Sequence, residues 1–137
     1  MPPATVSPER SGAWRPDVVQ VIVVDDNQAM QQLMAYVIRG AGFRAVTADH
    51  GLGALALLQD HQDIRLIISD LDMPILDGLG LLRRLRLIGG PPALIITARG
   101  RKVDEEHALE LGAAGVLRKP FSRQELLRAA APFLSPA

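Results

Sequence analysis

The chain has 137 residues, enough for one domain with a hydrophobic core but with little room for a second. Its 15 basic and 15 acidic residues balance, so bulk charge favours neither nucleic acid nor a membrane surface as a partner. The absence of cysteine excludes disulfides and thiolate metal sites and is typical of the cytoplasm. Because no apolar stretch approaches a membrane span or resembles the core of a signal peptide, we expect a cytoplasmic protein without a membrane partner.

The N-terminal residues differ in composition from the rest of the chain. Residues 1–16 contain four prolines among Ser, Thr, Arg and Gly, which predicts a flexible extension ahead of a domain over 17–137. Trp14 is the one large apolar group of this extension. It could anchor a partner, but we favour the interpretation that it covers an edge of the fold.

Beyond the extension, five strand patterns alternate with five helix patterns. Short runs rich in Val and Ile predict strands at about 19–24, 43–48, 65–69, 93–97 and 115–118. Amphipathic patterns predict helices at about 28–39, 52–60, 77–87, 101–111 and 122–134. Strict alternation with short loops predicts an α/β fold, a parallel sheet with right-handed crossovers and helices on both faces.

Local signals mark two helix starts and one helix face. Ser122 with Glu125 three residues later forms a capping-box pattern, and Asp77 before Gly78 is typical of a cap or turn. The first helix is expected to bury an apolar stripe of Met30, Leu33, Met34, Val37 and Ile38.

The three histidines, which lack the spacing of metal ligands, are interpreted as surface residues: His50, His61 and His107.

Acidic residues follow two of the apolar runs. Asp25 and Asp26 come directly after the first strand, and Asp70 ends the third. In an open parallel sheet these strand ends lie at one edge, where ligands bind. Three converging carboxylates would hold a hard divalent cation such as Mg²⁺, and Asp70 would be the nucleophile that takes a phosphoryl group. A single acid before a helix could instead be an N-cap.

Two further polar residues end the remaining strands of this edge. Thr97 finishes the fourth strand and Lys119 the fifth. Thr97 would donate a hydrogen bond to the phosphoryl group, and Lys119 would place a point charge beside another of its oxygens. Either residue alone would more often be an ordinary strand residue or a solvated charge, so the prediction depends on their joint placement.

Four motifs, in order and at the ends of the expected strands, carry a family resemblance over about residues 18–134. The chain resembles the receiver domains of response regulators in two-component signalling. The motifs are Val-Val-Asp25-Asp26-Asn, Ser69-Asp70-Leu-Asp-Met73-Pro74-x-x-Asp77-Gly78, Ile-Ile-Thr97-Ala98 and Lys119-Pro120-Phe121.

The resemblance implies a flavodoxin-like, doubly wound five-stranded sheet of order 2-1-3-4-5, in three αβα layers. It implies that Asp70 receives a phosphoryl group from a histidine kinase or a histidine phosphotransfer protein, with Mg²⁺ or Mn²⁺. Asp26, Asp70 and the backbone carbonyl of Asp72 would bind the metal directly, and Asp25 through water. The Lys119–Pro120 bond is expected to be cis.

Two other functions are alternatives to a phosphorylated receiver. The sequence Asp70-Leu71-Asp72 imitates the nucleophile motif of haloacid-dehalogenase-type phosphatases, in which the second Asp is a general acid and base. That family places its acidic pair after the lysine, whereas Asp25 and Asp26 here precede every other motif. A receiver-like module that is never phosphorylated is disfavoured because the acids, hydroxyl and lysine are all present. We therefore expect a signalling phosphoacceptor rather than an enzyme.

The sequence departs from the family at the expected switch. Three residues before the lysine the family usually carries Tyr or Phe, and this chain has Val116. A change on phosphorylation would then act mainly through Thr97. Asp72 and Arg99 occupy the family's two variable positions near the path of the hydrolytic water and are expected to pair and shield the phosphoryl group.

The chain shows no helix-turn-helix or basic recognition helix after the last predicted helix, so direct nucleic-acid binding is not expected. Output would be contact with a downstream protein target, through the face of the last two helices and the last strand. Dimerisation on phosphorylation is possible in this family. A stand-alone regulator and a receiver cut from a larger protein remain alternatives.

Overall fold

The computed structural model describes residues 18–98 and 101–134, with five parallel strands in the order β2-β1-β3-β4-β5. The predicted doubly wound, flavodoxin-like topology is therefore confirmed. The strands are β1 (Val21–Val24), β2 (Ala45–Ala48), β3 (Leu66–Asp70), β4 (Ala93–Ala98) and β5 (Gly115–Lys119). The helices are α2 (Gln28–Gly40), α3 (Gly51–Asp60), α4 (Gly78–Ile88), α5 (Lys102–Glu110) and α6 (Arg123–Leu134).

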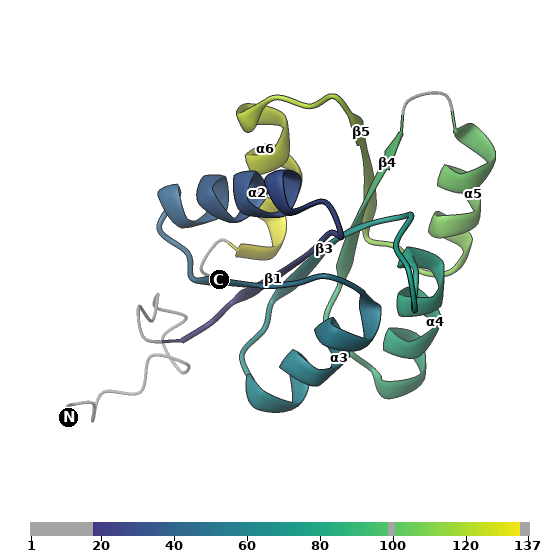
Figure 1. Cartoon of the computed structure of the whole chain (residues 1–137), viewed down its shortest axis with the longest axis horizontal. Coiled ribbons are helices and arrows are strands. Elements are labelled where there is room, and N and C mark those ends of the chain that lie inside the picture. The colour runs from purple at the N-terminus through teal and green to yellow at the C-terminus, as the bar shows by residue number, and fades with distance from the viewer. Residues whose placement is uncertain (1–17, 99–100, 135–137) are drawn as a thin grey trace.

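The helices cover the sheet in two layers (Figure 1). α2 and α6 lie on one face, and α3, α4 and α5 lie on the other. Two apolar clusters fill the spaces between these layers, and β1 and β3 contribute side chains to both. Every residue of β1 and β3 is buried, which explains why their sequences are nearly continuous apolar runs.

The register of the strands brings their carboxyl ends to one edge of the sheet. Val24 pairs with Ser69, Asp70 pairs with Ile96, and Ala98 pairs with Lys119. β1 and β2 each begin two residues later than predicted, and β3 extends one residue further, to Asp70. Such shifts are usual at strand ends, and they leave the predicted functional residues at the edge.

Side-chain caps fix the starts of α3, α4 and α6, whereas Arg101, the N-cap of α5, makes no side-chain cap hydrogen bond. Asp77 is the N-cap of α4 and accepts a hydrogen bond from the backbone N–H of Gly80, as expected for a cap. The capping box before α6 is confirmed, since Ser122 Oγ accepts from Glu125 N at 3.0 Å and Glu125 accepts from Ser122 N at 2.8 Å. His50 is more than a surface residue, because its half-buried ring accepts from Gly53 N and caps α3.

Two predictions fall on residues that the structure does not describe. One is the expected N-terminal extension with Trp14, and the other is the role of Arg99. Within 18–98 and 101–134, none of the helices combines the length and the apolar character that crossing a membrane requires.

Candidate functional site

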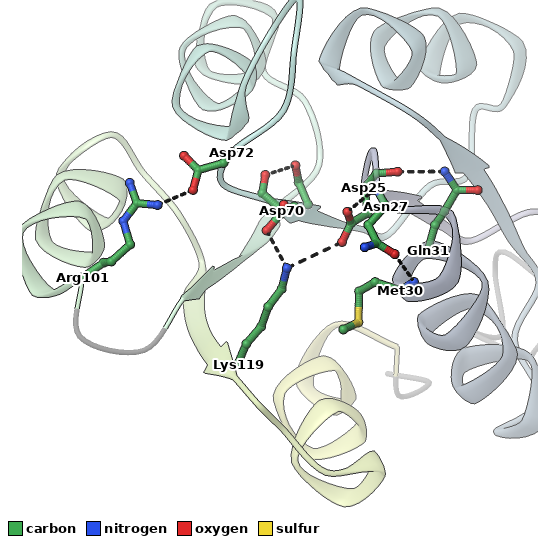
Figure 2. A network of polar contacts seen from close by, with 9 residues as sticks. Asp25, Asn27, Met30, Gln31, Asp70, Asp72, Arg101 and Lys119 are labelled. Carbon is green, nitrogen blue, oxygen red and sulfur yellow. Dashed lines mark hydrogen bonds and ion pairs between the residues drawn. The ribbon is translucent and has the colours of Figure 1, made fainter.

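Three carboxylates meet at the carboxyl edge of the sheet, and Figure 2 shows two of them, Asp25 and Asp70. Asp25 and Asp26 follow β1, Asp70 ends β3, and one oxygen from each lies within 4.8 Å of the others. Asp25 is fully buried, Asp70 is 9% exposed and Asp26 faces solvent. The cluster that the strand ends predict is therefore formed.

Lys119 reaches into this cluster from the end of β5. Its Nζ lies 3.2 Å from Asp70 Oδ1 and 4.0 Å from Asp25 Oδ2, so one ammonium group contacts two buried carboxylates. The Lys119–Pro120 peptide bond is cis, as expected. Among the predicted residues, Lys119 is thus the cation of the site.

The surroundings of the carboxylates work against their ionisation. Burial raises the pKa of Asp70 above its ordinary value, while the charge and hydrogen bond of Lys119 act in the opposite direction. Burial is also the main cause of the raised pKa of Asp25, where the backbone N–H of Asn27 lowers it and the nearby Asp70 raises it further. Additional positive charge in the cluster would favour the ionised forms.

Two buried oxygen atoms of the site lack a hydrogen-bond partner among the described residues. They are Asp25 Oδ2 and Thr97 Oγ1, each fully enclosed by the protein. Buried polar atoms are nearly always satisfied in folded proteins, so these two are placed to contact a ligand. A carboxylate cluster with a buried oxygen that accepts no hydrogen bond fits a hard divalent cation, and a hydroxyl without a hydrogen-bond partner fits an anionic oxygen acceptor.

The loop after Asp70 folds closely against the strand end. Leu71 N donates to Ile96 O at 3.0 Å, and Gly78 N donates to Leu71 O at 2.8 Å. A Cβ on Gly78 would lie 2.8 Å from Asp70 O, so only glycine fits there. The same loop holds Ile75 at φ 71°, inside a tight turn closed by Leu76 N and Pro74 O at 2.7 Å. No local signal predicted this conformation, because β-branched residues rarely adopt a positive φ.

Asp72 has a partner that the sequence reasoning did not identify. Its carboxylate forms an ion pair with Arg101, which precedes α5 and also pairs with Asp104. The expected partner, Arg99, lies outside the described residues. Arg101 is separated from Asp72 by 29 positions, and the only signal for the contact was an arginine at the start of a helix near the site.

Gln31 of α2 is a second residue that was missed. It is 2% exposed, and its Nε2 donates to Asp25 O at 2.9 Å and Ala48 O at 3.0 Å. The prediction that Leu33 lies on the buried face is wrong, since Leu33 is 52% exposed. The buried face of α2 is rotated toward Gln31, where an amide can reach the carbonyl groups at the ends of β1 and β2.

Val116 lies in β5, half-buried against the apolar cluster under α3, α4 and α5. The position that the resemblance assigns to an aromatic switch is thus occupied by a small side chain in a packed setting. Its role in switching stays a prediction.

The comparisons with known proteins agree with this geometry. The model of the response regulator receiver domain matches residues 21–131. A CpxR homolog of Haemophilus influenzae, named a transcriptional regulatory protein, is 35% identical over 108 residues, which are 79% of this chain and 47% of that protein. The chain spans about half the length of the curated relatives it matches.

Solved structures extend the comparison to the fold. The receiver domain of NtrX from Brucella abortus superposes with a TM-score of 0.79 at 28% identity, over 86% of this chain and all of that one (100%). The chemotaxis protein CheY4 of Vibrio cholerae gives 0.78 at 29% identity, over 85% of this chain and 99% of that one. The chain belongs to the family of response regulator receiver domains.

Proposed function

We propose that this receiver domain takes a phosphoryl group onto Asp70 from the phosphohistidine of a histidine kinase or a histidine phosphotransfer protein. The main support is the placement of Asp70 beside Lys119 at 3.2 Å, in a cluster with two other carboxylates. Asp70 is 9% exposed at the end of β3, where a phosphoryl group on its oxygen would meet Lys119 and Thr97, which lies on the neighbouring strand β4.

In the proposed transfer an Asp70 oxygen bonds to phosphorus while the P–N bond of the donor breaks. The electron pair of that bond stays on the imidazole nitrogen, which then takes up a proton, and Asp70 carries an acyl phosphate. The Lys119 ammonium would leave its ion pair with Asp70 to contact one phosphoryl oxygen. The unpartnered Thr97 hydroxyl would donate to another.

We propose Mg²⁺, or Mn²⁺ in its place, as the cofactor. Asp26, Asp70 and the backbone carbonyl of Asp72 would hold it directly and Asp25 through water, and it would supply positive charge against the carboxylates and the phosphoryl oxygens. Support comes from the three carboxylates within 4.8 Å and from Asp25 Oδ2, which accepts no hydrogen bond from the described residues.

We favour a signalling phosphoacceptor over a phosphatase because of the surroundings of Asp72. In the phosphatase alternative the second acid must move a proton, yet the Asp72 carboxylate is engaged by Arg101.

We further propose that the chain acts in the cytoplasm and signals by contact with a downstream protein, without binding nucleic acid itself. The balance of 15 basic and 15 acidic residues supports the last point.

Intact-mass spectrometry tests the phosphoacceptor. The wild-type chain, incubated with acetyl phosphate and Mg²⁺, should gain one phosphoryl group, and a phosphorylated histidine phosphotransfer protein should donate in the same way. Asp70→Asn should abolish both reactions, whereas Asp60→Asn, an exposed acid at the end of α3, should react normally. Retained labelling of the Asp70→Asn variant would overturn the assignment.

A further inference from the structure

An apolar groove lies between α2 and α6, at the end of the sheet opposite to Asp70. Its volume is about 170 Å³, and the residues that line it are all apolar: Ala41, Phe43, Leu127, Ala131 and Leu134. The two helices pack against each other on one face of the sheet (Figure 1). None of the residues in 18–98 and 101–134 fills the groove.

The groove continues the hydrophobic core beneath α2 and α6. Phe43 and Leu127 are half-buried and pack against that core, and Leu134 belongs to it. Ala41 and Ala131 are exposed, so the groove is open to the surface between two small side chains. Apolar cavities of about 150 Å³ accept a benzene ring, and this groove of about 170 Å³ is slightly larger. Its size and lining therefore fit one aromatic side chain.

The chain enters the sheet beside this groove. Gln20, just before β1, donates its backbone N–H to Arg44 O at 3.0 Å, and its Oε1 accepts from Arg44 N at 3.2 Å. Arg44 directly follows Phe43, which lines the groove. Since consecutive Cα atoms are about 3.8 Å apart, Gln20 lies within about 10 Å of the groove wall at Phe43.

Trp14 is within reach of the groove. It lies outside the described residues, six positions before Gln20, and six residues of chain can span up to about 20 Å. It is the only tryptophan of the chain and the only aromatic residue ahead of β1. The three residues that follow Leu134 are Ser, Pro and Ala, none of which has a side chain large enough to fill the groove.

We propose that the groove between α2 and α6 binds the indole ring of Trp14 from the same chain. The ring extends the core at the open end of the groove and covers Phe43 and Leu127. The neighbouring Arg15 supports this contact, because α2 and α6 both end at the groove and helix C-termini attract positive charge. The contact requires no phosphoryl group, so it goes beyond the proposed phosphotransfer and does not depend on it.

The short connection favours Trp14 over an aromatic side chain of another molecule. Only five residues separate Trp14 from Gln20, and a tether of this length gives a local concentration in the millimolar range. A second copy of the chain, or a different protein, at about 1 µM would have to overcome a roughly thousandfold difference in concentration. An intramolecular contact is therefore the favoured state of the groove.

Tryptophan fluorescence of the whole chain tests the proposal, because Trp14 is the only tryptophan. Its emission should be shifted to the blue relative to the same chain unfolded in urea. Burial of a large apolar side chain favours the docked form at least about tenfold, so quenching by acrylamide should be at least about fivefold weaker than in urea.

A charge placed in the groove should release the ring. Ala131→Glu introduces a carboxylate at an exposed helical position on one wall, and Ala41→Glu does so on the other. In each variant the quenching of Trp14 should rise close to its value in the unfolded chain. Ala56→Glu makes the same substitution at an exposed position of α3, on the other face of the sheet, and should leave the quenching unchanged. Circular dichroism establishes that the chains compared are folded.

A concentration series identifies the source of the ring. Since the local concentration of a tethered ring is in the millimolar range, the quenching should be the same from about 1 µM to about 100 µM protein. Protection that grows with protein concentration would overturn the proposal and assign the groove to a second copy.

The other contrary results would also overturn it. A wild-type chain in which Trp14 is as exposed as in urea would leave the groove to a different protein. Protection that survives in both folded groove variants would place Trp14 elsewhere, and so would its loss in the Ala56→Glu control.

Discussion

The inner and outer parts of the site lie along one edge of the sheet but in different surroundings. The inner part, comprising Asp25, Asp70, Thr97 and Lys119, is mostly buried, and burial raises the pKa of both carboxyls. In the outer part, Asp72 and Arg101 form an ion pair in contact with solvent. Asp70 and Asp72 are two residues apart and of the same type. The two carboxyl groups therefore differ only in how deeply they are buried and in which residues they contact.

This difference separates two kinds of effect. Buried charges interact strongly because little water screens them, whereas an exposed ion pair gains little and is weakened by salt. Changes in the inner part should therefore abolish or greatly slow phosphoryl transfer, or destabilise the fold. Changes in the outer part should only adjust rates.

Removal of the inner cation should have the largest effect. Lys119→Met keeps the length of the side chain but loses the ammonium group that lies 3.2 Å from Asp70. We expect the rate of phosphorylation by acetyl phosphate to fall about a hundredfold, as when a charge-stabilising donor is removed from other active sites. Lys102→Met, at the exposed start of α5, is the control. Equal rates for the two variants would contradict the role of Lys119.

The close packing beneath Asp70 can be tested through its glycine. The added methyl group of Gly78→Ala would lie 2.8 Å from Asp70 O and 2.9 Å from Leu71 Cα, and backbone atoms cannot move aside easily. We expect the free energy of unfolding to fall by about 1–3 kcal/mol, measured by urea denaturation. Gly40→Ala, whose methyl group would approach only the Arg123 guanidinium at 3.7 Å, should be neutral or slightly stabilising. A Gly78→Ala chain as stable as the wild type would show that the loop is not packed as described.

The hydrogen bonds of Gln31 support the inner part from α2. Gln31→Leu leaves the buried carbonyl group of Asp25 without this donor, whereas the Ala48 carbonyl keeps the hydrogen bond from Asp25 N. We expect a loss of about 1–3 kcal/mol in the free energy of unfolding, since unsatisfied buried acceptors are costly. Gln124→Leu, at an exposed position of α6, is the control and should have almost no effect. Similar stabilities for the two variants would mean that water replaces the Gln31 amide.

These residues also mark how far the sequence predicts the site. Parallel strands bring their carboxyl ends to one edge of the sheet, whatever the details of packing. The residues at these ends were therefore predictable: Asp25, Asp70, Thr97 and Lys119. Gln31 could not be predicted in this way. Hydrophobic periodicity locates the buried face of a helix only approximately, and it favours apolar residues on that face. The positive φ of Ile75 contradicts the local preference of its residue type, so tertiary packing must impose it. The contact between Asp72 and Arg101 joins two loops that are far apart in the sequence. No local sequence pattern indicates that these loops meet.

The outer part gives the smallest predicted effect, on the lifetime of the phosphoryl group. The ion pair of Asp72 with Arg101 crosses from the loop after Asp70 to the start of α5, so it can restrict the approach of water to an acyl phosphate on Asp70. Asp72→Ala and Arg101→Ala should each shorten the half-life of the phosphorylated chain by roughly two- to fivefold, in line with the small energies of exposed pairs. The double variant should resemble either single one, because both changes break the same contact. Half-lives are measured by intact mass after removal of the phosphodonor, with Arg84→Ala of α4 as the control. If each single change leaves the half-life unaltered or lengthens it, shielding by this ion pair is wrong, and a free Asp72 would instead orient the attacking water.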